Sequence, residues 1–88
     1  MDELILKLLK MDLMIQSERL DDYLKVLVQT AKELICREGI GLQENYEDSL
    51  LVEMYAAYLY RKRKEDVAMP RMLRFALNNR LLGESANG

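Results

Sequence analysis

The residue types that most often carry enzyme chemistry are scarce in this sequence. It contains no histidine, the side chain most often used for acid–base catalysis and metal binding near neutral pH. The single cysteine, Cys36, has no histidine to activate it and no second ligand at metal-binding spacing. The sequence therefore predicts a protein that is not an enzyme and that uses no metal or cofactor.

Two short motifs could be mistaken for catalytic or phosphate-binding sites. Asp21 and Asp22 are adjacent in sequence, so they do not share a face of a helix, and negative charge is in any case favoured at a helix start. The segment Gly39–Ile40–Gly41 is too short for a phosphate-binding loop. Both motifs are better explained as helix boundaries.

Charge is distributed unevenly along the chain. Residues 1–60 contain six Lys/Arg and twelve Asp/Glu, a net charge of −6, whereas residues 61–88 contain seven and three, a net charge of +4. The basic run RKRK at 61–64 could complement a helix dipole or bind nucleic acid, but the whole chain is acidic at −2. An acidic part and a basic part in one small domain also suit head-to-tail contacts between copies, which close into rings.

The hydrophobic pattern predicts four helices and no strand. The first helix spans Asp2 to about Lys10 and is too short to be stable unless it docks. The second is expected to begin with Ser17 as its N-cap and to end at Gly39. Its apolar residues recur at three- and four-residue spacing, which is typical of an amphipathic helix. They are Leu20, Tyr23, Leu24, Leu27, Ala31, Leu34 and Ile35.

The third helix, within residues 45–64, is the expected centre of the domain. Between Leu50 and Tyr60 only Glu53 is charged, and apolar residues point in every direction around the helix. A helix that is apolar on all sides is normally buried on all sides. Asn45 is the expected N-cap.

The fourth helix is expected to run from Pro70 to about Leu82 and to stop at Gly83. At 100° per residue, Phe75 and Leu82 point away from its core stripe. That stripe consists of Leu73, Ala76, Leu77 and Leu81, flanked by Met72. The expected fold is a small all-α domain of four helices (short, long, long and buried, short) over residues 1–83, with a flexible tail at 84–88.

Length and composition agree with one small domain. The 88 residues are 50% hydrophobic and 32% charged, which is typical of a globular chain. No apolar run approaches the length of a membrane span, and the first residues do not have the pattern of a signal peptide. A lone cysteine agrees with a reducing compartment. No membrane partner is therefore expected.

Three segments carry a resemblance to a known family: SERLDDYLKVLVQTAKELI, MYAAYLYRKR and MPRMLRFALNNRL. Together they resemble the head–tail connector, or adaptor, family of tailed bacteriophages and prophages. In that family an LxxYL-type segment opens a long helix, a buried helix ends in a tyrosine and an arginine-containing pair, and a proline-started stretch carries leucines and a late arginine. The matching residues are Leu20, Tyr23 and Leu24; Tyr60, Arg61 and Arg63; and Met69, Pro70, Leu73 and Arg80.

The resemblance covers about residues 2–82 and implies a structural role without catalysis. Family members form a ring, taken to be a dodecamer, beneath the portal protein, and they connect it to the tail-completion proteins. DNA passes through the lumen without sequence recognition. The implied location is the connector of the virion, with assembly in the bacterial cytoplasm. Acidic residues, rather than the basic run, are expected nearer the channel.

The contact with a neighbouring copy or with the portal is expected to use the segment from Arg61 to Leu82. An apolar anchor rimmed by charge is what such a contact requires. The expected partner-binding residues are Arg61, Arg63, Lys64, Arg71, Arg74, Phe75 and Leu82. The alternative is a small helical phage regulator, a DNA-binding or protein-interaction module. Against it, the loop at 39–44 joins two long helices and not a compact recognition pair.

Overall fold

The computed structural model describes residues 1–87, and within them the side chains up to residue 84. These residues form four helices and no strand, as the hydrophobic pattern predicts. The helices are α1 (Asp2–Asp12), α2 (Asp21–Arg37), α3 (Tyr46–Lys62) and α4 (Arg71–Asn87). The predicted fold class, a small all-α domain of four helices, is confirmed.

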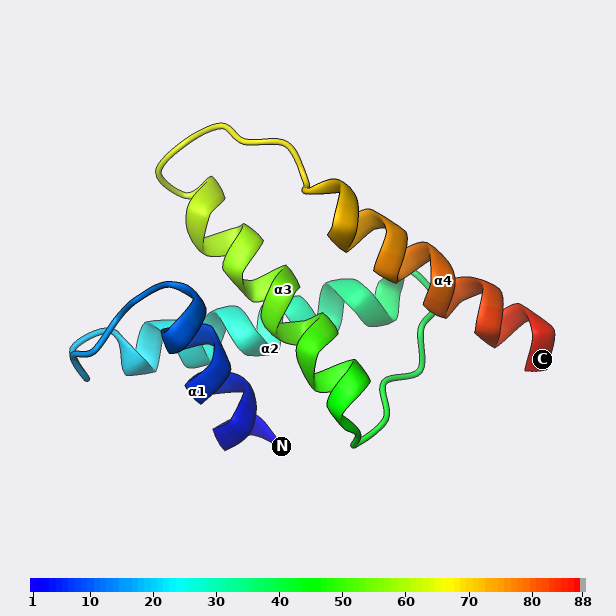
Figure 1. The fold of residues 1–88 in the computed structure, drawn as a ribbon, viewed down its shortest axis with the longest axis horizontal. Coiled ribbons are helices and arrows are strands. Elements are labelled where there is room, and N and C mark those ends of the chain that lie inside the picture. The colour runs from blue at the N-terminus through cyan, green and yellow to red at the C-terminus, as the bar shows by residue number, and fades with distance from the viewer. Residues whose placement is uncertain (88) are drawn as a thin grey trace.

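Helix α3 occupies the centre of the molecule. It crosses α2, which lies behind it in Figure 1, and packs between α1 on one side and α4 on the other. The segment between α3 and α4 passes over one end of the domain (Figure 1), and its Met69 packs against the core. The expectation that α3 is the central helix is therefore confirmed.

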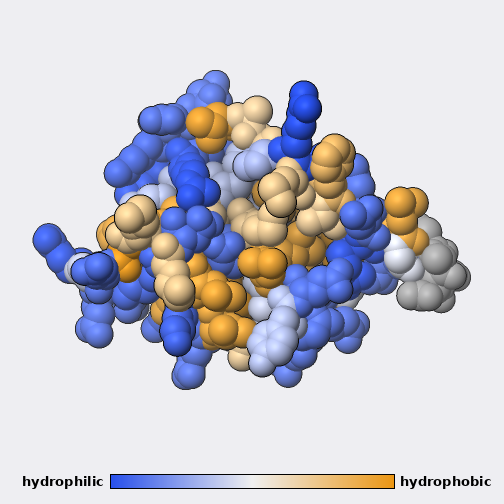
Figure 2. All heavy atoms as spheres, viewed as in Figure 1, coloured by the Kyte–Doolittle hydropathy of each residue, from blue (hydrophilic) through white to orange (hydrophobic). Residues whose placement is uncertain are grey.

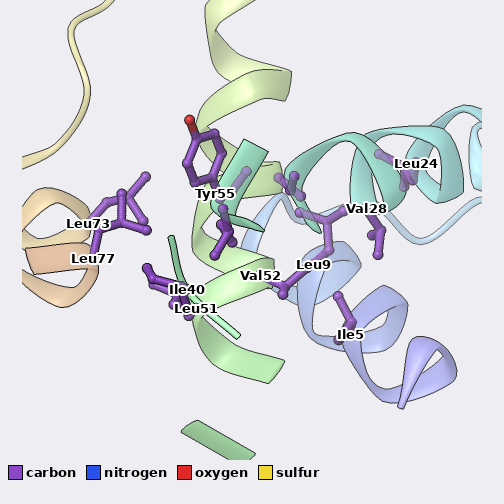
Figure 3. Close-up of a cluster of buried hydrophobic side chains, with 14 residues drawn as sticks. Ile5, Leu9, Leu24, Val28, Ile40, Leu51, Val52, Tyr55, Leu73 and Leu77 are labelled. Atoms are coloured by element: carbon purple, nitrogen blue, oxygen red, sulfur yellow. The ribbon is translucent and has the colours of Figure 1, made fainter. Parts of the chain in front are cut away.

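The hydrophobic core extends to both sides of α3. Figure 3 shows Ile5 and Leu9 of α1 near Val28 of α2 on one side, and Leu73 and Leu77 of α4 on the other. Val52 and Tyr55 of α3 lie between these groups. Other buried members include Leu24, Ala31, Ile35, Ile40, Leu51, Ala56 and Ala57. The helical stripes identified in α2 and α4 thus supply most of the core that those helices bury.

The helix boundaries follow local capping in one case and not in another. Asn45 caps α3, since its Oδ1 accepts a hydrogen bond from the Asp48 N–H at 2.7 Å. The expected Ser17 cap is wrong: Ser17 Oγ accepts from the Arg19 N–H at 3.1 Å in a turn that precedes the helix. Helix α2 begins four residues later than Ser17, at Asp21, without a side-chain cap.

The end of α2 agrees with its sequence signal. Gly39 adopts φ +102°, a left-handed conformation that favours glycine, and its amide donates to the Cys36 carbonyl at 3.0 Å. A Cβ at this position would lie 3.4 Å from Leu81 Cδ2 of α4. Gly39 therefore both ends α2 and allows the following segment to turn beneath α4.

Four features differ from the predicted fold, and the first is the extent of α4. Helix α4 does not stop at Gly83 but continues to Asn87, so its length of 17 residues equals that of α2 and α3. The Arg80–Glu84 ion pair, at 3.0 Å and one turn apart, spans Gly83 and offsets part of the ~1 kcal/mol that a glycine costs inside a helix. Residues 84–87, expected to form a tail, thus belong to α4, and residue 88 lies outside the described residues.

Further differences concern burial and the end of α1. Helix α3 is not buried on all sides, because Leu50 is 51% exposed on one side of its first turns, whereas Asp48 and Ser49 on the other side are buried. Met72, expected beside the core stripe of α4, is 75% exposed. Helix α1 also runs on to Asp12, two residues beyond the expected end.

Candidate functional site

Two of the acidic residues on α3 are buried, and one of them anchors α4. Asp48 is 2% exposed and receives two hydrogen bonds from Arg80, from Nε at 2.9 Å and from Nη2 at 3.0 Å. The Gln43 N–H donates a third at 2.7 Å. Burial alone would raise the pKa of Asp48, but the Arg80 guanidinium and the Gln43 amide hold that pKa below its ordinary value.

Arg80 also reaches the loop that precedes α3. Its Nη2 donates to the Gly41 carbonyl at 2.9 Å, and its Nη1 donates to Glu84 Oε1 at 3.0 Å. The hydrogen-bonded Asp48 carboxylate raises the pKa of the Arg80 guanidinium above its ordinary value. All of these contacts lie within the chain, so Arg80, the late arginine of the resemblance, here holds α4 against the start of α3.

The second buried acid faces α1. Glu53 is 3% exposed, and burial together with the nearby Asp12 carboxyl raises the pKa of Glu53 to about 8. A hydrogen bond from Glu53, supported by Arg61, lowers the pKa of Asp12. Arg61 Nη2 lies 3.2 Å from Asp12 Oδ1. At neutral pH the two carboxyl groups therefore share one proton, and Arg61 covers the remaining negative charge.

Two segments of the resemblance meet in an aromatic stack. The Arg63 guanidinium carbon lies 4.9 Å from the ring centroid of Tyr23 on α2 and 4.4 Å from that of Tyr60 on α3. Lys64 Nζ lies 5.9 Å from the Tyr60 centroid. These distances are typical of cation–π contacts, which stabilise the end of α3 against α2. The tyrosine of the LxxYL-type segment and the tyrosine–arginine motif thus form one contact.

The predicted partner-binding residues fall into two groups. Arg61, Arg63 and Lys64 lie at the end of α3 and contact Asp12 or tyrosine rings of their own chain. Arg74 on α4 pairs with Glu38 at 2.8 Å, which ties α4 to the end of α2. The basic run is consequently engaged with its own chain, which the sequence pattern did not indicate.

The second group lies on the side of α4 that faces away from the core. Phe75 is 62% exposed and Leu82 is 68% exposed, as the helical spacing predicts, and Met72 and Arg71 are exposed beside them. We call these four residues the α4 outer face. Figure 2 shows apolar side chains at the surface along α4, among hydrophilic neighbours. This face has the composition of a protein contact, with apolar anchors beside a charge.

A second exposed apolar surface was not identified from sequence. Tyr46 is 83% exposed and Leu50 is 51% exposed, one helical turn apart at the start of α3, with Glu44 and Glu47 exposed beside them. We call these four residues the α3 acidic patch. The sequence did not indicate this patch, because the apolar residues on all sides of α3 predicted burial for Leu50. Only the positions of α1, α2 and α4 show which side remains uncovered.

Among the described residues, no group of three or more His, Cys, Asp or Glu side chains is arranged to hold a metal ion. Cys36 is exposed on α2. No helix within residues 1–87 is both long enough and apolar enough to cross a membrane.

Comparison with known proteins adds no assignment. No protein-family model matches the chain, and neither a curated protein sequence nor a solved structure matches it.

Proposed function

We propose that this chain is a structural subunit of a phage or prophage head–tail connector. It would form a ring between the portal protein and the tail-completion proteins, around the channel through which DNA passes. The proposal rests first on the three segments that resemble the adaptor family and cover about residues 2–82. The observation that carries it is the Tyr23–Arg63–Tyr60 stack, in which residues of two of those segments contact each other.

The mechanism is geometric and not chemical. Each subunit is a small helical wedge that repeats around an axis, as a dodecamer in the particle, and offers the α4 outer face to a neighbour or to the portal. An exposed Phe75 and Leu82 beside Arg71 support this role, since apolar anchors with a charged rim are typical of protein contacts. The protein would belong to the virion and would be assembled in the bacterial cytoplasm.

The channel is proposed to let DNA pass without gripping it. Arg61 is paired with Asp12, and Arg63 is stacked between two tyrosines, so both are less available to phosphate groups than free side chains would be. This supports the placement of acidic residues nearer the lumen. A wall rich in free arginine would bind DNA strongly at low salt.

Ring formation on the portal protein encoded in the same genome tests the proposal. We expect wild-type protein to add a ring of density to portal particles in electron micrographs, and Phe75→Asp to fail although it is folded. Val26→Asp is the matched control, because Val26 is 60% exposed on α2 and outside the proposed face. Absence of wild-type protein from portal particles would contradict the proposed function.

Duplex binding separates the connector from the alternative, a small phage regulatory or DNA-binding module. Residues 61–64 are expected to give only feeble affinity for duplex DNA at physiological salt, and neutralising all four should leave retention unchanged. Micromolar binding that falls steeply with salt and disappears in the neutralised variant would favour the alternative. A gel-shift titration at two salt concentrations makes the measurement.

A further inference from the structure

The exposed start of α3 presents an apolar and acidic surface of its own. Tyr46 and Leu50 lie on the same side of the helix, since residues four apart are neighbours on a helix surface. Glu44 and Glu47 are exposed beside them. Exposed apolar side chains that lie together and are rimmed by polar residues mark contact surfaces more often than isolated ones do. A partner that is apolar and basic would be complementary to the α3 acidic patch.

The α4 outer face has the complementary composition. Met72, Phe75 and Leu82 supply apolar area, and Arg71 supplies positive charge. None of the ion pairs between described side chains uses Arg71, Glu44 or Glu47. The charges on both surfaces are thus free for a contact with another molecule, unlike those of Arg61 and Arg74.

We infer that the α4 outer face of one copy docks on the α3 acidic patch of a second copy. Opposite charges at the rims favour this pairing over a contact of either surface with itself, which would bring like charges together. The inference deepens the proposed function, because it names the two surfaces that successive subunits of the ring share.

The two surfaces lie on different elements of the fold. Helix α3 begins at the lower edge of the view in Figure 1, whereas α4 runs along the right-hand side. A contact between unlike surfaces is heterologous: each copy keeps one surface free after the first contact, so further copies can add. The assembly closes into a ring when the rotation between successive copies closes.

The single contact must be weak. A stable interface buries about 1,600 Å² in total, and four exposed residues on each side supply only part of that area. We therefore expect association of the free protein at roughly 0.1–1 mM, and much tighter assembly when the portal holds several copies together.

Two variants that each lose one surface test the inference. Leu50→Arg removes the apolar centre of the α3 acidic patch and brings positive charge against Arg71, but it leaves the α4 outer face intact. Phe75→Asp removes the apolar centre of the α4 outer face and leaves the α3 acidic patch intact. In sedimentation velocity up to about 1 mM, wild-type protein should form a concentration-dependent series of oligomers. Each variant alone should be monomeric, and an equal mixture should form a one-to-one heterodimer that goes no further. Val26→Asp should behave as wild type.

Exchange of the rim charges provides a second test. Glu47→Arg and Arg71→Glu should each weaken association about tenfold, because each places like charges opposite one another, and the double variant should recover most of the loss. All of these positions are exposed, so thermal unfolding should be nearly unchanged and serves as the folding control.

Three results would overturn the contact: wild-type protein that stays monomeric at every concentration, a Leu50→Arg variant that still self-associates, or a mixture that forms no heterodimer. Its failure is distinguishable from failure of the proposed function. If wild-type protein joins the portal while the mixture of the two variants stays monomeric, the connector role is supported and this contact is excluded. If the heterodimer forms but the portal recruits no protein, the contact is supported and the connector role is excluded.

Discussion

The two buried carboxyl groups of α3 differ in charge although they lie on the same helix. Asp48, near its start, faces Arg80 of α4 and is ionised. Glu53, in its middle, faces Asp12 of α1 and is protonated at neutral pH. Burial disfavours the charged form of both, so the neighbour decides the outcome. A guanidinium within hydrogen-bond distance keeps one group ionised, and a second carboxyl group keeps the other neutral.

The two sides of α3 are therefore stabilised by different interactions. On the α4 side, directional hydrogen bonds from Arg80 supplement the packing of Leu73 and Leu77. On the α1 side, Ile5 and Leu9 supply the packing, and a shared proton avoids placing two negative charges together. Removal of a charge should therefore damage the first side, whereas removal of a proton should damage the second.

The largest effect is expected from Arg80→Met, which breaks the α4 side. It leaves the Asp48 carboxylate buried without its cationic partner, a change that typically costs about 3–5 kcal/mol. Urea unfolding should show a loss of that size relative to wild type. In the double variant Arg80→Met with Asp48→Asn, part of the stability should return, because the unpaired charge is gone. Equal loss in the single and double variants would contradict the role of the ion pair.

A rise in pH is expected to lower the folding stability by a smaller amount, through the α1 side of α3. The pKa of Glu53 is about 8 when folded, above the ordinary value of 4.5, so the folded state holds a proton that the unfolded state releases. The resulting stability is complete below pH about 4.5 and declines as the pH rises through 8. The lowered pKa of Asp12 acts in the opposite direction only in acid, as the pH falls through its folded value.

Glu53→Gln should remove this dependence. The amide keeps a hydrogen-bond donor toward Asp12 but cannot ionise, so the variant should be about 1–3 kcal/mol more stable than wild type at pH 9. Urea midpoints at pH 6 and pH 9 make the comparison. The exposed acid Glu47, changed to Gln, is the matched control and should follow wild type. A wild-type protein equally stable at both values would exclude the shared proton.

The next effect concerns the cap that shares Asp48 with the α4 side. Asn45→Ala removes the hydrogen bond to the Asp48 N–H and should cost about 1 kcal/mol, whereas Asn45→Asp should cost little. Because cap and ion pair meet at one residue, the losses from Asn45→Ala and Arg80→Met should not add. Strict additivity in a double-mutant cycle would show that the two contacts act independently.

The smallest effect is expected at the end of α3. Arg63→Met keeps the apolar stem but removes the charge between Tyr23 and Tyr60, which should cost about 0.5–1 kcal/mol. Thermal unfolding should shift by only a few degrees, and the shift should persist at high salt, since a cation–π contact with partly buried rings is weakly screened. Arg37→Met, exposed at the last turn of α2, should change nothing measurable.

The sequence by itself determined those features that depend on neighbours along the chain. Helical spacing identified four helices, the core stripe of Leu73 and Leu77, and the exposure of Phe75 and Leu82. The caps at Asn45 and Gly39 were also readable, because a cap is formed by residues within a few positions of one another. For the candidate site, this was enough to locate Phe75 and Leu82 of the α4 outer face but not Met72 or the α3 acidic patch.

Tertiary structure decided everything that depends on contact between helices. The sequence contains Asp48, Glu53 and Arg80, but only the packed helices determine which acid meets a guanidinium and which meets another carboxyl group. The same holds for Leu50, whose exposure depends on which side of α3 its neighbours leave open. Periodicity specifies a face on a helix, whereas the partner of that face is set by elements far away in the chain.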